Sequence, residues 1–200
     1  MTKYILAGGG DRDSAEYGQN LSAEILKTIS GDISVLSCFF ALPEAKLQEA
    51  VIAFEPWFRE NFGQNMQYVI ASEANFVDQI READVIYLHG GDDDLLIGAL
   101  KRYSDLALYF KDKIVIGSSA GAISLAKQSW SCDSRMVVTG LGLVPTNTIV
   151  HFDSDYAQKR GLQPIDWLQA ETELRAAIGP NEKISKLAEG AFEVFTSENH

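Results

Sequence analysis

The sequence alternates short apolar runs with longer amphipathic segments, and this alternation limits the fold more than any other feature. The runs are rich in β-branched and aromatic residues and span residues 4–7, 33–39, 67–70, 85–88 and 114–116. Helical patterns lie between them, for example at 15–29, 47–58 and 93–103. Because continuous apolar strands joined by helices are typical of βαβ units, we predict an α/β fold whose mostly parallel sheet is covered by helices on both faces.

The second half of the chain follows the alternation less regularly. Residues 136–138 and 148–152 are expected to be strands, and 165–178 a helix. Residues 184–187 and 191–195 are expected to form a terminal hairpin around Glu189 and Gly190. In the first half, Pro56 is expected to kink or end its helix. With neither a repeat nor a flexible linker in the sequence, we predict a single domain spanning residues 1–200.

Composition and charge exclude several classes of protein. The chain has 200 residues, of which 17 are basic and 28 acidic, so its formal net charge is −11. This balance argues against a nucleic-acid or anionic-membrane partner, since both require a basic face. No apolar run is long enough for a signal peptide or a membrane span. Cys38 and Cys132 lack metal-site spacing, and we expect buried thiols in a cytoplasmic protein rather than a disulfide.

A G-x-S-x-G sequence gives the clearest indication of chemistry. An apolar strand at 114–116 runs into Gly117-Ser118-Ser119-Ala120-Gly121, and an apolar-patterned segment follows. In this strand–turn–helix setting, a sharp turn lifts the serine side chain off the end of the sheet, as in a nucleophile elbow. The N–H groups at the start of the next helix favour a developing oxyanion. Ser119 is therefore the candidate nucleophile, and a purely structural turn of small residues is the alternative.

A serine nucleophile needs a base, and the chain has only three histidines. His200 is the last residue, while His89 and His151 each follow a predicted strand. Sites in open α/β sheets form at the carboxyl ends of strands, so both could lie near Ser119. We favour His151 because acidic residues flank it. Asp133 and Glu189 are both candidates for the acid that orients the base, and the sequence does not choose between them.

Two glycine-rich turns are expected at the same sheet edge. Gly8-Gly9-Gly10 follows the first strand, and Leu88-His89-Gly90-Gly91 precedes Asp92, Asp93 and Asp94. Neither turn has the spacing of a dinucleotide or phosphate-binding loop. The three aspartates suggest either a metal site or, for at least one of them, a helix N-cap, and we favour the cap. We predict neither a metal nor a cofactor.

Four segments together resemble a known family. AGGG near the N-terminus, EADVIYLHGGDDDLLIGAL, IVIGSSAGAISLA and LGLVPTNTIVHFD follow the order and spacing of the dipeptidase E / cyanophycinase family of serine peptidases. The resemblance covers about residues 3–195. It implies a glutamine-amidotransferase-like α/β fold and a Ser-His dyad oriented by an acid. It also implies cleavage of peptide bonds after an N-terminal aspartate or within cyanophycin.

The resemblance assigns roles to individual positions. Ser119 matches the nucleophile, His151 the base, and Asp133 lies near the family's acid. Gly91 and Ala120 match the residues whose N–H groups form the oxyanion hole. Glu189 matches an acid in a late motif of the family. The resemblance thus implies a complete hydrolytic site.

The chain also departs from the family. Asp92 stands where the aspartyl dipeptidases have asparagine and would repel an acidic substrate, whereas Arg160 could attract one. Only 11 residues follow Glu189, and we expect the shortened edge to leave an open site or to be covered in a homodimer.

The expected function is a serine exopeptidase or dipeptidase that acts on small peptides through an acyl-enzyme. One alternative is an esterase, because the order Ser119, Asp133, His151 also fits α/β-hydrolases. The other is a binding homologue that has kept the fold and lost activity.

Overall fold

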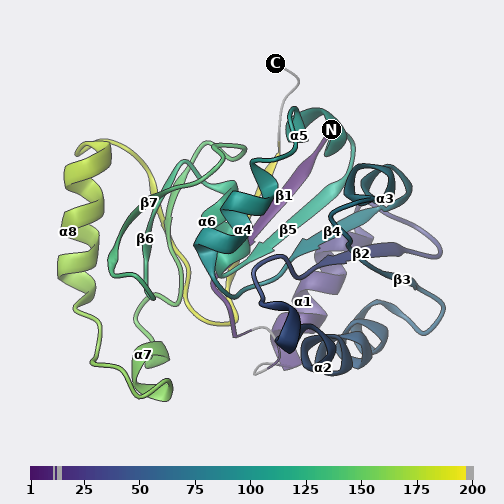
Figure 1. Ribbon diagram of the computed structural model, residues 1–200, viewed down its shortest axis with the longest axis horizontal. Helices are drawn as coiled ribbons and strands as arrows, with labels where there is room; N and C mark the ends of the chain where they lie inside the picture. Colours follow the sequence, from purple (N-terminus) through teal and green to yellow (C-terminus); the bar gives the residue numbers. More distant parts are fainter. Residues whose placement is uncertain (11, 13–14, 197–200) are drawn as a thin grey trace.

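The main sheet of the molecule has six strands. The computed structural model describes residues 1–10, 12 and 15–196. Its strand order is β10-β1-β5-β4-β2-β3, and all neighbours are parallel except the β1–β10 pair (Figure 1). The strands are β1 (Lys3–Ala7), β2 (Ser34–Cys38), β3 (Gln67–Ile70), β4 (Val85–Leu88), β5 (Ile114–Ser118) and β10 (Phe192–Thr196). The predicted α/β class with a mostly parallel sheet is confirmed.

Helices cover both faces of this sheet, also as predicted. One face packs against α1 (Ala15–Leu26) and α2 (Glu44–Phe62). The other face packs against α3 (Phe76–Glu82), α4 (Asp93–Leu100), α5 (Leu106–Tyr109) and α6 (Ala120–Leu125). Alternate residues of each strand point to opposite faces, so Ile5 and Ala7 join the first core and Tyr4 and Leu6 the second. This double burial explains why the central strands are apolar throughout.

A second, smaller sheet adds a layer beyond α6. It contains β6 (Gln128–Ser131), β7 (Met136–Thr139), β8 (Asn147–Ile149) and β9 (Ile184–Lys186), in the order β7-β6-β8-β9. Helix α8 (Trp167–Ile178) packs on the outer face of this sheet, and the short helix α7 (Tyr156–Lys159) lies near one end of it (Figure 1). The sequence predicts strands near β7 and β8, but it does not predict that they leave the main sheet.

The predicted terminal hairpin is wrong. Strand β9 pairs with β8 in the second sheet, whereas β10 pairs with β1 in the main sheet. Leu187 N–H donates to Ile149 and Gly8 N–H donates to Ala191, so each end of the connection is tied to a different sheet. The two strands therefore cannot pair with each other, and the segment that contains Glu189 crosses from one sheet to the other.

Of the two effects predicted for Pro56, an end of the helix is wrong, because α2 continues past Pro56 to Phe62. A proline removes one helical hydrogen bond. Here its ring is exposed, and Val51 before it and Phe58 after it are buried against the sheet. Packing on both sides of Pro56 thus outweighs the lost bond.

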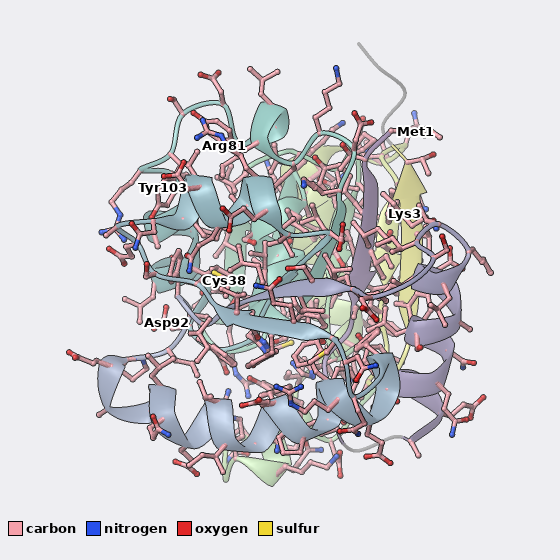
Figure 2. The ribbon with its side chains drawn as sticks, turned by 90° about the vertical axis from the view of Figure 1, so that its right-hand side faces the viewer. Met1, Lys3, Cys38, Arg81, Asp92 and Tyr103 are labelled. Atoms are coloured by element: carbon pink, nitrogen blue, oxygen red, sulfur yellow. The ribbon has the colours of Figure 1, made fainter. Side chains whose placement is uncertain are left out.

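Cys38 and Cys132 are both free and buried, as predicted (Figure 2 labels Cys38). Burial raises the pKa of each thiol to about 12, so neither is a thiolate at neutral pH. Among the residues that the structure describes, none of the helices combines the length and the apolar character that a bilayer span requires.

Candidate active site

Ser119 occupies the sharp turn between β5 and α6. Its backbone has φ 51° and ψ −111°, a strained conformation for a residue with a side chain. The glycines on either side are required by close packing. A Cβ atom on Gly117 would lie 2.4 Å from the carbonyl oxygen of Gly121, and one on Gly121 would lie 2.1 Å from that of Leu88. The strand–turn–helix setting predicted for the G-x-S-x-G sequence is confirmed.

Three successive carbonyl groups after β1 hold the segments of the site together. The Ala7 oxygen accepts from Ser119 N–H at 3.0 Å, and the Gly8 oxygen accepts from His151 N–H at 3.0 Å. The Gly9 oxygen accepts from Gly190 N–H at 2.8 Å. The glycine-rich turn therefore fixes the backbones beside the serine, the histidine and the late acid relative to one another.

Ser119, His151 and Glu189 form a line of hydrogen bonds. The Oγ atom of Ser119 lies 2.9 Å from Nε2 of His151, and Nδ1 of His151 lies 3.1 Å from Oε1 of Glu189. With the carboxylate as acceptor, Nδ1 carries the proton, and unprotonated Nε2 can accept from the hydroxyl. Burial lowers the pKa of His151 below 6.5, although the hydrogen bond and charge of Glu189 act in the opposite direction. The imidazole is therefore neutral at pH 7 and can take a proton.

Asp133 does not make this contact with the imidazole. Its carboxylate accepts from the Tyr156 hydroxyl at 3.0 Å and forms an ion pair with Arg160 at 2.6 Å. Asp133 belongs to the exposed turn between β6 and β7, and its carboxylate there pairs with the guanidinium of Arg160. The ring of Tyr156 stacks on His151 with centroids 3.8 Å apart. Of the two acids that the sequence leaves open, Glu189 contacts the imidazole directly, while Asp133 binds Arg160 and the tyrosine that stacks on the imidazole.

His89, the other internal histidine, belongs to the core. Its ring stacks on Phe39 with centroids 3.9 Å apart, and its Nε2 atom lies 2.6 Å from Oγ of Ser37. Burial, together with the positive charge of Arg12, lowers the pKa of His89 well below 6.5. His89 is thus a neutral core residue. His200, the third histidine, lies outside the described residues.

Gly91 and Ala120 line the space next to Ser119, as expected for the two predicted oxyanion donors. Ala120 is the first residue of α6, so its N–H group has no acceptor within the helix. Of the backbone hydrogen bonds described outside helices and strands, none is donated by Gly91 or Ala120. Both N–H groups are therefore available to an oxygen bound beside the serine.

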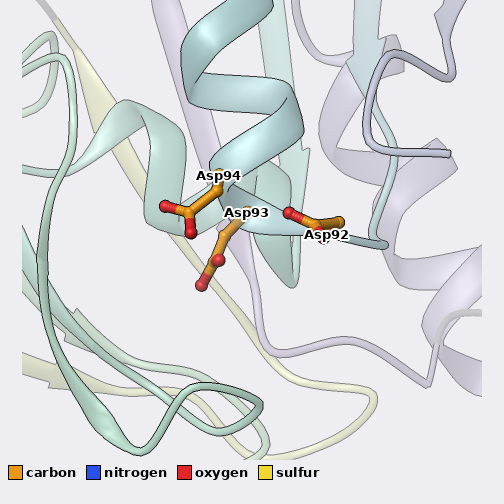
Figure 3. Close-up of side chains that lie close together, drawn as sticks. All are labelled: Asp92, Asp93 and Asp94. Carbon is orange, nitrogen blue, oxygen red and sulfur yellow. The ribbon is translucent and has the colours of Figure 1, made fainter. Parts of the chain in front are cut away.

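Asp92, Asp93 and Asp94 lie together at the start of α4 (Figure 3). The Asp92 carboxylate accepts from Leu95 N–H at 2.9 Å, so the predicted helix cap is confirmed. Asp93 is buried, and burial raises its pKa. One oxygen from each aspartate lies within 4.8 Å of the others, and such acidic groups are common without an ion. The cap and the buried position account for two of the three without a metal.

Two cavities meet at Gly91. One, of about 350 Å³, contains Ser119, His151 and Glu189, together with the cationic side chains Arg12, Lys159 and Arg160. The other, of about 780 Å³, contains Asp92, Asp93, Asp94 and Asp133, together with Lys46 and Arg160. Of the two predicted substrate-binding residues, Arg160 thus lines both cavities, whereas Asp92 lines only the second.

Sequence reasoning missed three contributors to the site. Tyr156 and Lys159 lie in the short helix after His151, a stretch that reads only as polar. Lys159 binds the second oxygen of Glu189 at 3.2 Å and Asp155 at 2.9 Å. Arg12 follows the glycine-rich turn, and its basic side chain at that sheet edge was the only sign in the sequence that it lines the site. Their roles depend on which chain segments meet, which a single sequence does not show.

Comparison with known proteins gives consistent results. Residues 4–178 match the model of Peptidase family S51. A peptidase from an acI-B1 Actinobacterium has a similar structure, with a TM-score of 0.67 at 17% identity over 98% of this chain and 83% of that one. A putative peptidase E protein from Listeria monocytogenes EGD-e has a TM-score of 0.65 at 16% identity, and the match covers all of both chains. No curated protein matches.

Proposed function

This chain belongs to peptidase family S51 and is a peptidase, and we propose that it is a serine-type dipeptidase that acts through Ser119, His151 and Glu189. The observation that carries the proposal is the unbroken line of hydrogen bonds from the Ser119 hydroxyl through the imidazole to the carboxylate. A nucleophile, a base and an acid that orients the base are the parts that acyl transfer by serine requires. The resemblance to dipeptidase E supports the same chemistry.

In the proposed mechanism, His151 Nε2 takes the hydroxyl proton while Ser119 Oγ attacks the scissile carbonyl carbon. The N–H groups of Gly91 and Ala120 stabilise the negative oxygen that forms. His151 then gives its proton to the leaving amine, and an acyl-enzyme remains on Ser119. Water, activated by the same imidazole, releases the acyl group. Glu189 stabilises the imidazolium in both steps, and Lys159 fixes the second oxygen of Glu189.

The surroundings of Gly91 favour substrates whose first residue is neutral or basic. The cavity beyond Gly91 carries four aspartates against Lys46 and Arg160, and Arg160 is already paired with Asp133. Buried Asp93 also borders the recess beside Ser119. An acidic side chain bound in the cavity beyond Gly91 would be repelled by these carboxylates. This reading differs from the aspartyl preference that the family resemblance implies.

A substrate panel tests the proposed function. Dipeptides with aspartate, alanine or lysine as the first residue would be compared with p-nitrophenyl esters of short acids, with amine or phenolate release as the readout. We expect turnover of dipeptides, with alanine and lysine ahead of aspartate. Hydrolysis of esters alone would favour the esterase reading, and no turnover of either class would favour a binding homologue.

The rise of kcat/KM at acid pH should report the pKa of His151. Because the base works only when neutral and its pKa is lowered, kcat/KM should rise to half its plateau below pH 6.5. In Glu189→Gln, the negative charge that raises this pKa disappears, so the midpoint should move to lower pH. The plateau should also fall, by about 10²-fold or more, because the imidazolium loses its partner. Glu182→Gln, an exposed change outside the cavity, should leave the profile unchanged. A midpoint that stays fixed or moves upward in Glu189→Gln would contradict this role for the carboxylate.

Gly9→Ala should slow hydrolysis because it displaces the His151 imidazole, although it removes none of the catalytic groups. A Cβ atom on Gly9 would lie 2.3 Å from Cε1 of His151, and its φ of 97° is unfavourable for alanine. The imidazole must therefore shift, and a displacement of about 1 Å can cost about 10²-fold in rate. Gly31→Ala is a matched control, because Gly31 has a similar φ of 96° and an open surrounding. Steady-state kinetics with thermal unfolding would check this, and equal losses of activity in both variants would contradict it.

A further inference from the structure

The structure assigns Arg12 as the receptor for the free α-carboxylate of the leaving residue, an inference that rests on the proposed function. Arg12 lines the cavity that contains Ser119 and His151. A dipeptide is distinguished from longer peptides by a carboxylate one residue after the scissile bond. A guanidinium at the correct end of the cavity would therefore make the enzyme a dipeptidase rather than a general aminopeptidase.

The other two cations in this cavity each have an acidic partner. Lys159 binds Asp155 and Glu189, and Arg160 binds Asp133. Among the described residues, no salt bridge involves Arg12. A guanidinium that lines the same cavity as the nucleophile is suited to an anionic ligand.

Phe54 holds the guanidinium in place. Its ring lies 4.6 Å from the Arg12 guanidinium carbon, and Phe54 itself packs edge-on against the buried ring of His89. A guanidinium above an aromatic ring still has N–H groups that can form two parallel bonds to a carboxylate.

The direction of the reaction places the leaving residue on the Arg12 side. His151 gives its proton to the leaving amine, so the departing residue lies against the imidazole. The backbone of Gly9 passes the imidazole, and that of Gly10 passes the side chain of Glu189. Arg12 follows two positions later and borders the same cavity. The larger cavity, which Gly91 and the three aspartates at the start of α4 line and which does not include Arg12 or His151, is left for the acyl residue.

Matched substrates test this assignment. The dipeptide that the panel shows to be hydrolysed best would be compared with its C-terminal amide. A third substrate, with aspartate as the second residue and a C-terminal amide, offers a side-chain carboxylate instead. We expect kcat/KM for the free acid to exceed that for the amide by about 10-fold to 100-fold, as for one charge-assisted bidentate contact. The aspartyl amide should behave like the plain amide.

Arg12→Gln should remove this preference and leave catalysis intact. The KM for the free acid should rise by about 10-fold to 100-fold, with kcat within about threefold, because the lost contact is made equally in ground and transition states. Activity on the amide should not change, and Arg12→Lys should recover only part of the preference. Arg81→Gln, an exposed change on α3 that lies outside the cavity, should match the unchanged enzyme.

Several outcomes would overturn the assignment. The first is an Arg12→Gln enzyme that still prefers the free acid to the amide. The second is an unchanged enzyme that shows no such preference. The third is an aspartyl amide that is hydrolysed as efficiently as the free acid. Failure of the proposed function looks different, because the unchanged enzyme would then hydrolyse neither the acids nor the amides. Turnover of the amide by Arg12→Gln thus separates the two results.

Discussion

Replacing Ser119 by alanine is expected to reduce kcat for dipeptide hydrolysis by about 10⁴-fold to 10⁶-fold, the range for loss of a serine nucleophile. The hydroxyl is the group that forms the covalent bond with the substrate. Cys132, which borders the recess beside Ser119, has its pKa raised to about 12 by burial. The fold should survive, because Ser119 N–H still donates to Ala7 and alanine fits the space of serine.

Steady-state kinetics with circular dichroism would check the Ser119→Ala variant. Ser104→Ala provides a matched control, because Ser104 is an exposed serine between α4 and α5 that lines neither cavity. The control should keep full activity. A Ser119→Ala enzyme with native spectra and more than about a tenth of the normal turnover would remove the serine from the mechanism.

Replacing His151 by glutamine is expected to cost about 10⁴-fold or more in kcat, because a nucleophile and its base act as a unit. Glutamine can keep a hydrogen bond to Ser119 or Glu189, but it cannot take up a proton. Dipeptide binding should change little, since the imidazole contributes to proton transfer and not to recognition of charge. The expected signature is therefore a large fall in kcat with KM within a few-fold.

The same kinetics distinguish His151 from an alternative base. If another group took the proton, His151→Gln would lose less than about tenfold and its acid limb would move to that group's pKa. Tyr156, which stacks on His151, gives a useful comparison. Tyr156→Phe keeps the ring and loses only the hydroxyl contacts with Asp133 and Arg160, so its effect should be far smaller.

The sequence predicts the parts of this site that depend on local pattern. Ser119 follows a buried strand and is flanked by glycines that the turn requires, so its position could be read directly. His151 could be placed at the same sheet edge because it follows a predicted strand. Both inferences use only the strand direction and the residues immediately beside each group.

The sequence could not decide whether Asp133 or Glu189 orients His151, because the answer depends on the strands with which β9 and β10 pair. The predicted hairpin would have paired the strands on either side of Glu189 with each other. Instead β9 and β10 join different sheets, and the connection carries Glu189 to the imidazole. Asp133, which the family resemblance favoured, is bound by Arg160 and Tyr156. Pairing partners far apart in sequence decide both outcomes, and composition and periodicity do not specify them.

The continuity of α2 shows the same limit in a simpler case. Local propensity assigns a break at Pro56, whereas burial of Phe58 and Val51 on the sheet keeps the helix intact. Packing contributed by other segments outweighs one lost hydrogen bond, and a reading of the local sequence does not include that contribution.

A double-mutant cycle of dipeptide hydrolysis tests most directly whether Ser119 and His151 act as one unit. The kcat values of Ser119→Ala, His151→Gln and the double variant would be compared with that of the unchanged enzyme. If the hydroxyl depends on the imidazole, the double variant should be no slower than the slower single variant, within about threefold. Losses that multiply, or a single variant with nearly normal turnover, would contradict the account.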